Sequence, residues 1–304
     1  MKILLVSEIP FLATAIMALT DVLYLVVLLI IAVVVRLIMG QMFWHRDIKR
    51  FVTAGNYTMH YQPVVLSDRI VALEALICLP EEFIRDGLNK DEVIGYIDRH
   101  AINYTFAREV FCTVLQDYIR HFHGAPAVII SINVPPIAVC CSDLVSFFLD
   151  TLREAGIPPG TFMLEITERT SIPSKGLFIQ NLKRLQRGGF LLAIDDAGRG
   201  LSKDIIALRF PFDYVKVEVS ILKEEHVRRT ESPFWTAVQD ARRGIIVERI
   251  ETARDVKLAQ TLCRHPLQQG WFWWRAMTAE EAAALLSENK VRAGADTEGG
   301  HCSV

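Results

Sequence analysis

The sequence lacks the cysteine and histidine spacings that mark a zinc site or a disulfide framework. Its six cysteines include no CxxC pair, and no histidine lies at zinc-finger spacing from them. We therefore expect ordinary thiols, as in a reducing compartment. The sequence also lacks a charge bias: a formal net charge of −2 gives no reason to expect binding to a nucleic-acid polymer.

Internal repeats and a glycine-rich phosphate turn are missing as well. No such turn follows the first strand-like run, at residues 59–65, and the motif Gly198-Arg199-Gly200 comes too late and is too short for a dinucleotide-binding fingerprint. An open doubly wound sheet would need that turn. Its absence favours a closed barrel among the folds in which strands and helices alternate.

Strand-like and helical segments alternate regularly from residue 59 onward. Eight runs read as strands: residues 59–65, 70–76, 128–134, 162–167, 190–194, 212–217, 245–250 and 267–271. Helices are expected over 90–121 (as two helices), 142–155, 175–187, 232–243, 253–263 and 279–289. The first two strands are joined by the tight turn Ser67-Asp68, so we expect them to be antiparallel. The predicted fold class is α/β, a (β/α)8 TIM-like barrel with an antiparallel first strand.

The N-terminal part is strongly apolar. Residues 22–35 form an unbroken apolar run that, with its neighbours, approaches the roughly 20 residues needed to span a bilayer. Arg36 can snorkel to the interface, and Trp44, His45 and Arg46 form an aromatic and basic flank. The positive-inside rule then places everything after residue 45 in the cytoplasm. A cleaved signal peptide or a buried helix is the alternative, but no small-residue cleavage site follows the run.

These features predict four parts. Residues 1–41 are an N-terminal membrane anchor with one transmembrane helix, 42–56 a linker, 57–290 the barrel domain and 291–304 a flexible tail. The predicted location is the inner (cytoplasmic) membrane, crossed once, with the barrel domain in the cytoplasm. No stretch of the sequence is expected to form a sensor domain.

Polar residues stand in or just beyond most of the strand-like runs. They are Glu74, Asn133, Glu165, Asp195 with Asp196, Lys216, Glu248 and Gln269. In a (β/α)8 barrel the C-terminal ends of the strands converge on one mouth. Hard oxygen ligands gathered there suggest Mg²⁺ or Mn²⁺ and phosphate chemistry. An ion pair is the alternative for any one of these charges, but together they favour a metal-dependent hydrolytic site.

Three of these residues carry chemistry of their own. Asp195 and Asp196 are adjacent carboxylates, which repel each other unless a cation lies between them. Lys216 lies on a mostly apolar strand, where its ammonium could hold or polarise a nucleophilic water. A structural ion pair is the equal alternative for Lys216.

A set of motifs in one order resembles the EAL family of cyclic-di-GMP phosphodiesterases. They are Tyr61-Gln62-Pro63, Glu74-Ala75-Leu76, Leu164-Glu165-Ile166-Thr167-Glu168, Ile194-Asp195-Asp196, Phe212-Asp213-Tyr214-Val215-Lys216, Val247-Glu248-Arg249-Ile250-Glu251-Thr252 and Gln268-Gln269-Gly270-Trp271. The resemblance covers about residues 46–286. It implies hydrolysis of cyclic-di-GMP to the linear dinucleotide with two Mg²⁺ or Mn²⁺ ions.

The resemblance also implies a role for each site residue. The first metal would be held by Glu74, Asn133, Glu165 and Asp195, and the second by Asp195 and Asp196. Lys216 and Glu248 would orient and deprotonate the attacking water. Gln62 would contact the substrate, Gln269 would lie beside metal and substrate, and Glu168 would brace the loop after Asp196.

Several positions depart from the family pattern. Cys78 stands where an arginine usually contacts a substrate phosphate, and Pro135 replaces a small polar residue. The loop at 197–201, Glu218, Val247 and Arg249 also differ from the usual residues. In the family this loop helps organise the second metal and a dimer contact, so a homodimer or a regulatory protein partner stays open. The aromatic cluster at 271–274 is interpreted as packing under the last helix, with a partner surface as the alternative.

Loss of the residues that surround and orient metal ligands typically lowers metal affinity or activity by about 10- to 100-fold. The alternative function is therefore a catalytically weak or inactive EAL-like protein that acts as a cyclic-di-GMP receptor or protein-interaction regulator. A different phosphate ester as substrate is a third interpretation.

Overall fold

The computed structural model of the chain describes residues 9–55, 57–67, 69–79, 90–100, 102–124, 128–200, 202–228 and 233–288, and only some of the side chains of the first helix and of the helix at 219–228. The chain divides into two compact units, Met1–Phe51 and Val52–Val304. The predicted tail at 291–304 lies outside the described residues, and the predicted domain boundaries stay predictions.

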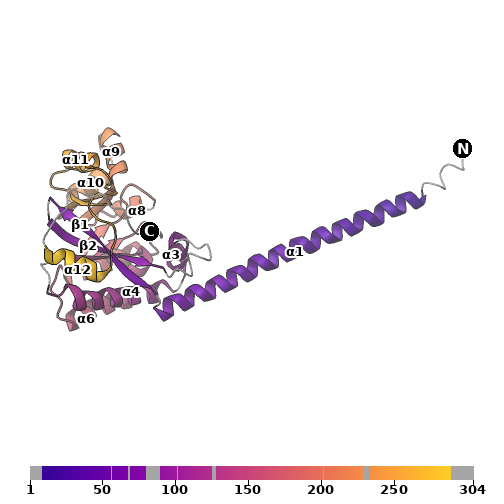
Figure 1. Ribbon diagram of the computed structural model, residues 1–304, viewed down its shortest axis with the longest axis horizontal. Helices are drawn as coiled ribbons and strands as arrows, with labels where there is room; N and C mark the ends of the chain where they lie inside the picture. Colours follow the sequence, from indigo (N-terminus) through magenta and orange to yellow (C-terminus); the bar gives the residue numbers. More distant parts are fainter. Residues whose placement is uncertain are drawn as a thin grey trace. The chain divides into compact units, whose positions relative to one another are not determined.

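The first unit consists mainly of helix α1 (Ile9–Ala54), which continues through the segment predicted as a linker (Figure 1). From Val22 to Val35 its large apolar side chains are all exposed. Within the described part of the chain, however, no helix combines the length and apolar character needed to cross a membrane. The structure therefore does not support the predicted transmembrane helix.

The second unit is built on eight strands that close into a barrel in chain order. The strands are β1 (Thr58–Leu66), β2 (Arg69–Cys78), β3 (Ile129–Val134), β4 (Phe162–Ile166), β5 (Leu191–Ile194), β6 (Tyr214–Glu218), β7 (Gly244–Glu248) and β8 (Leu267–Gln269). Strand β1 is antiparallel to both β2 and β8, and the remaining neighbours are parallel. The predicted barrel with its antiparallel first strand is confirmed.

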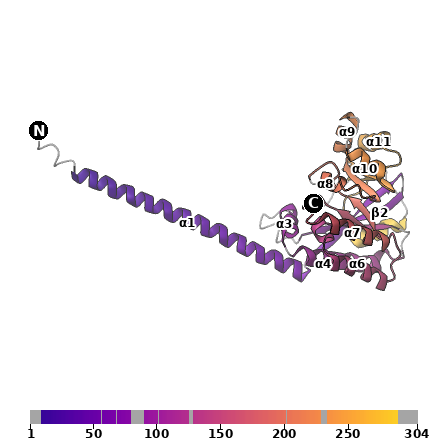
Figure 2. The ribbon, with the colours of Figure 1, turned by 180° about the vertical axis from the view of Figure 1, so that it is seen from behind.

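Helices lie outside the strands (Figures 1 and 2). They are α3 (Lys90–Arg99), α4 (Asn103–Asp117), the π-helix η1 (Tyr118–Phe122), α5 (Pro136–Val139), α6 (Ser142–Glu154), α7 (Lys175–Arg187), α8 (Ser202–Ile206), α9 (Val219–Arg228), α10 (Pro233–Asp240), α11 (Ala253–Leu262) and α12 (Ala279–Glu288). Of these, α5, α8 and α9 were not predicted. The first two are short, and α9 follows β6 without a turn residue that would mark its start.

The barrel interior is packed and not a pore. Its core consists of Val64, Ala72, Met163, Leu191, Ala193, Tyr214, Ile246 and Leu267, all buried. Strands β4 and β6 are buried at every position, as parallel barrel strands covered on both faces are. Both strands nevertheless carry charged residues, Glu165 on β4 and Lys216 and Glu218 on β6. Charges in fully buried strands require partners, and these partners lie at the mouth.

The outer layer is held by an aromatic cluster around Phe111 of α4. Its ring lies 4.5 Å from that of Phe148 on α6 and 5.9 Å from that of Phe162 on β4, measured between centroids. Phe111→Ala is expected to lower the free energy of unfolding by about 3–5 kcal/mol, because it leaves a cavity where α4, α6 and β4 meet. Urea denaturation checks this. Ile119→Ala, at a half-exposed site, is the control, with a change within about 0.5 kcal/mol. A loss below about 1 kcal/mol for Phe111→Ala would contradict this packing.

Candidate active site

The mouth of the barrel collects a side chain from every strand. Gln62 comes from β1, Glu74 from β2, Asn133 from β3, Glu165 from β4, Lys216 from β6, Glu248 from β7 and Gln269 from β8, while Asp195, Asp196 and Glu168 follow strands β5 and β4. The contacts described below connect all ten predicted site residues. The structure thus brings them together, and their chemical roles stay predictions.

Lys216 lies at the centre of this group. Its Nζ is 2.6 Å from Oε2 of Glu165, 2.9 Å from Oε1 of Glu248, 3.2 Å from Oδ1 of Asp195 and 3.3 Å from Oε2 of Glu74. The lysine side chain is only 1% exposed. Four strands therefore direct a carboxylate at one buried ammonium, and this contact fixes how the strand ends converge.

Amide groups orient the carboxylate of Glu74. Asn133 donates its Nδ2 to Oε1 of Glu74 at 2.8 Å, and Gln269 donates its Nε2 to Oε2 at 2.6 Å. Gln269 also donates its Nε2 to Oε1 of Gln62 at 3.2 Å, and Gln62 donates its own Nε2 to the backbone oxygen of Trp274 at 3.0 Å. These bonds hold the antiparallel strand β1 and its Gln62 at the same mouth.

A second acidic group lies beside the first. One carboxylate oxygen each of Glu168, Asp195 and Asp196 lies within 4.8 Å of the other two, close enough to share a cation. Asp196 has a φ of 44°, an uncommon backbone conformation for a residue other than glycine. A Cβ on Gly200 would lie 2.6 Å from Cγ of Glu168, so this glycine lets the loop pack directly on that side chain. Glu168 thus packs against this loop and lies beside the two aspartates.

The charges of this site perturb each other strongly. Burial raises the pKa of Glu165 well above its ordinary range, and burial together with the charges of Asp195 and Glu74 raises the pKa of Glu248 to about 8. Burial would also raise the pKa of Glu74, but the Lys216 ammonium and the bonds from Gln269 and Asn133 lower it to about 2. The carboxylates likewise keep the pKa of Lys216 well above its ordinary value, against the effect of burial. One ammonium does not neutralise four carboxylates, so the site favours further cations.

The residues at the mouth fit Mg²⁺ or Mn²⁺. The donors are carboxylate and amide oxygens, which such hard cations prefer. Among the described residues, Oε1 of Glu165 and Oε1 of Gln269 are buried and have no hydrogen-bond partner. Buried polar atoms are nearly always paired, so unpaired oxygens at this position point to a ligand that completes them.

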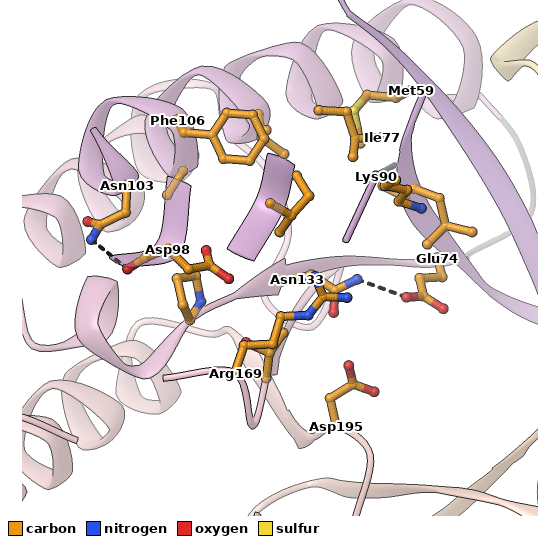
Figure 3. Close-up of a pocket in the computed structure, with 17 residues that line it drawn as sticks. Met59, Glu74, Ile77, Lys90, Asp98, Asn103, Phe106, Asn133, Arg169 and Asp195 are labelled. Atoms are coloured by element: carbon orange, nitrogen blue, oxygen red, sulfur yellow. Dashed lines mark hydrogen bonds between the residues drawn. The ribbon is translucent and has the colours of Figure 1, made fainter. Parts of the chain in front are cut away.

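Two cavities open beside these residues. One, of about 400 Å³, is lined by Gln62, Asp196, Glu248, Arg249 and Trp271 among others. The other, of about 180 Å³, reaches under α3 and α4 and shares Glu74, Leu76 and Asp195 with the first. Figure 3 shows its apolar side at Met59, Ile77 and Phe106 and its polar side at Asn133, Glu74, Asp195 and Arg169.

The structure adds Asp98 of α3, which the sequence analysis missed, to the wall of the smaller cavity (Figure 3). Burial raises the pKa of Asp98 to about 6, although Arg169 and Arg99 act to lower it. The carboxyl group of Asp98 has a pKa of 3.8 in the unfolded chain and of about 6 in the folded chain. The free energy of unfolding therefore falls as the pH rises from the first value to the second. Only the amphipathic pattern of α3, which buries Val93, Ile97 and Asp98 together, could have indicated the buried position.

Asp98→Asn is therefore expected to stabilise the protein at pH 8 by on the order of 1–3 kcal/mol and to change its stability little at pH 4. The asparagine resembles the protonated acid and removes the cost of burying its charge. Urea denaturation at both pH values checks this, with the exposed Asp150→Asn as the control. An equal change at pH 4 and pH 8 would show that Asp98 does not titrate as described.

Other residues at the mouth also differ from the sequence interpretation. Trp271, interpreted as packing under the last helix, is 51% exposed and lines the larger cavity. Glu218 and Arg249 line the same cavity. In the sequence, Glu218 was visible as a charge on an apolar strand and Arg249 as a charge next to Glu248. Neither pattern indicates which residues these side chains contact.

Comparisons with known proteins agree with this geometry. A model of the EAL domain family matches residues 45–276. An uncharacterized protein of Synechocystis is 28% identical over 248 residues, which are 78% of this chain and 35% of that protein. The chain spans 26–35% of the length of the first four curated relatives.

Solved structures of EAL domains share the fold. The EAL domain of DcpA from Mycobacterium smegmatis matches with a TM-score of 0.60 and 23% identity, covering 78% of this chain and all of that one (100%). BlrP1 from Klebsiella pneumoniae, solved as a complex with manganese and cyclic-di-GMP, matches with a TM-score of 0.57 and 25% identity, covering 73% of this chain and 56% of that one. Since the family model covers far more than half of its residues, the chain belongs to the EAL domain family.

Proposed function

We propose that the protein is a cyclic-di-GMP phosphodiesterase that hydrolyses one phosphodiester bond of the cyclic dinucleotide to give the linear form. The observation that carries this proposal is the group of carboxylates that four strands direct at Lys216, beside a second group at Glu168, Asp195 and Asp196. Membership of the EAL family and the manganese and cyclic-di-GMP in the BlrP1 complex support the choice of substrate and metal.

Two Mg²⁺ or Mn²⁺ ions fit these residues. Glu74, Asn133, Glu165 and Asp195 would hold one of them, and Asp195 and Asp196 the other, with Glu168 in reach of the second. When bound, such ions neutralise the attacking and leaving oxygens of an in-line displacement. The chain's own part is to fix these ligands on rigid strand ends.

Lys216 and Glu248 are proposed to act on the attacking water. Their side chains are in contact, Nζ to Oε1 at 2.9 Å, so one can hold a water molecule and the other accept its proton. Gln62 and Gln269, linked at 3.2 Å, lie in the same cavity and would contact the substrate. Removal of a proton from water as it attacks phosphorus makes it a stronger nucleophile.

The direct test is turnover of cyclic-di-GMP by the purified full-length chain with Mn²⁺ or Mg²⁺, with the linear dinucleotide as the expected product. Binding of cyclic-di-GMP without product at high protein concentration would instead identify a receptor. Turnover of another phosphate ester in preference to cyclic-di-GMP would identify a different hydrolase. Loss of all product after EDTA treatment, and its return with Mn²⁺, is expected if the metals act as proposed.

We also propose that α1 anchors the protein in the inner membrane with the barrel on the cytoplasmic side. The exposed apolar side chains from Val22 to Val35 support this, because such a surface is costly in water. The basic flank at Arg46, Lys49 and Arg50 supports the orientation. Separation of cell lysate tests it: the protein should sediment with membranes and resist extraction by salt. Recovery in the soluble fraction would refute the anchor and leave the phosphodiesterase proposal intact.

A further inference from the structure

Glu218 at the end of β6 binds two arginines. Its Oε2 lies 2.5 Å from Nη2 of Arg199, and its Oε1 lies 2.7 Å from Nε of Arg249. Ser220 also donates its hydroxyl to Oε2 at 3.1 Å. The carboxylate is only 5% exposed, and both of its oxygens have cationic partners. Glu218 is therefore paired with arginines and is not expected to bind a cation in the mouth.

The two arginines come from segments that carry site residues. Arg199 lies in the loop that follows Asp195 and Asp196, and Arg249 directly follows Glu248. Strands β6 and β7 bring Glu218 opposite Glu248 in register. Arg249 adopts a φ of 54°, a backbone conformation that costs an ordinary residue about 1–2 kcal/mol. The pairing with Glu218 holds the Arg249 guanidinium at the rim of the site.

The charge of Arg249 is unusual for its position. The larger cavity is lined by Glu74, Asp195, Asp196, Glu218, Glu248 and Glu251, and the cations among its described lining residues are Lys216 and Arg249. Lys216 is 1% exposed and already surrounded by carboxylates. Arg249 is 68% exposed. It is thus the lining cation that an anionic group entering the cavity can reach.

We propose that Arg249, held by Glu218, binds a phosphate of the cyclic dinucleotide at the mouth and so positions it over the carboxylates. The inference rests on the proposed function. A guanidinium fixed through one nitrogen keeps further N–H groups for a phosphate, which arginine binds in a planar, bidentate way. Trp271 lines the same cavity and is 51% exposed, and the Arg275 guanidinium stacks on one face of its ring, 4.5 Å from the centroid, so a nucleobase would stack on the other face.

The test measures cyclic-di-GMP binding by calorimetry with Mn²⁺ present, on the full chain in a Glu248→Gln background that removes the proposed proton acceptor. Arg249→Ala is expected to weaken binding about 10-fold or more. Arg249→Lys keeps the charge but not the planar guanidinium, so its cyclic-di-GMP affinity should lie between those of the arginine and alanine proteins. Glu218→Gln, which loosens the guanidinium, should weaken binding by a smaller factor. Arg153→Ala, in an exposed pair on α6, is the matched control and should change nothing.

Mn²⁺ affinity is measured on the same variants and is expected to be unchanged by Arg249→Ala. If Arg249→Ala binds cyclic-di-GMP as tightly as the parent, which is the Glu248→Gln protein, the inference is overturned and the proposed function stands. Loss of Mn²⁺ binding together with dinucleotide binding would also overturn it, because Arg249 would then support the metal ligands. Absence of binding by both the parent and the unmodified chain would overturn the inference together with the proposed function.

Discussion

Glu74→Ala is expected to lower cyclic-di-GMP turnover by at least about 100-fold. Residues that merely orient metal ligands already cost about 10- to 100-fold when they are lost, and Glu74 is proposed to be a ligand itself. Its carboxylate also receives the amides of Asn133 and Gln269 and lies 3.3 Å from the Lys216 ammonium. Its removal therefore takes one partner from each of three polar groups, although Lys216 keeps its other carboxylates and Gln269 keeps Gln62.

The measurement is the rate of linear dinucleotide formation under saturating Mn²⁺, with folding checked by circular dichroism. Glu74→Gln keeps the volume and loses the charge, so it separates a metal defect from a packing defect and should be equally inactive. Asp150→Ala, in an exposed ion pair on α6, is the control with unchanged turnover. Wild-type turnover by Glu74→Ala would remove Glu74 from the site.

Lys216→Met is expected to abolish turnover and to lower the free energy of unfolding of the metal-free protein by about 3–5 kcal/mol. Breaking a buried ion pair by removing one partner costs this much because the other charge stays buried. Here four carboxylates lose the same ammonium. Methionine has a similar length and no charge, so the loss reports electrostatics and not a cavity.

The pH dependence of this loss has a defined sign. Burial already raises the pKa of Glu165 and Asp195, and that of Glu248 to about 8. Acids with a raised folded-state pKa stabilise the fold below their ordinary pKa, and this stability is lost as pH rises toward the folded value. Without Lys216 these values rise further, so the destabilisation should be larger at pH 8 than at pH 5.5.

Urea denaturation at both pH values, with and without Mn²⁺, checks this prediction. Mn²⁺ is expected to restore part of the lost stability, because an ion that binds the folded state stabilises it by mass action. Lys203→Met, on the exposed side of α8, is the control. A loss of the same size at both pH values, unaffected by Mn²⁺, would mean that Lys216 does not balance these carboxylates.

The barrel and most of its site could be predicted from the sequence because the order of the strands along the chain is also their order in space. Glu74, Glu165 and Glu248 stand in or at the ends of strands that pair with parallel neighbours, so their sequence positions translate directly into a common mouth. Lys216 was visible as a charge on an otherwise apolar strand, which requires partners.

The remaining features depend on loop geometry, which local sequence patterns do not encode. The pairing of Glu218 with Arg199 and Arg249 joins a loop and two strand ends, and Asp196 and Arg249 in these segments have a positive φ. The exposure of Trp271 follows from the turn after Gly270, whose φ of 155° lets it pack on the backbone of Ile250. Neither turn has a two-residue signature that fixes its conformation in advance.

The central claim is that carboxylates from several strands hold divalent cations at the mouth of this barrel. An anomalous-scattering map from crystals of the protein grown with Mn²⁺ and cyclic-di-GMP tests it most directly. We predict two manganese peaks, one among Glu74, Asn133, Glu165 and Asp195 and one at Asp195 and Asp196. A map with bound dinucleotide and no manganese between these side chains would contradict the account.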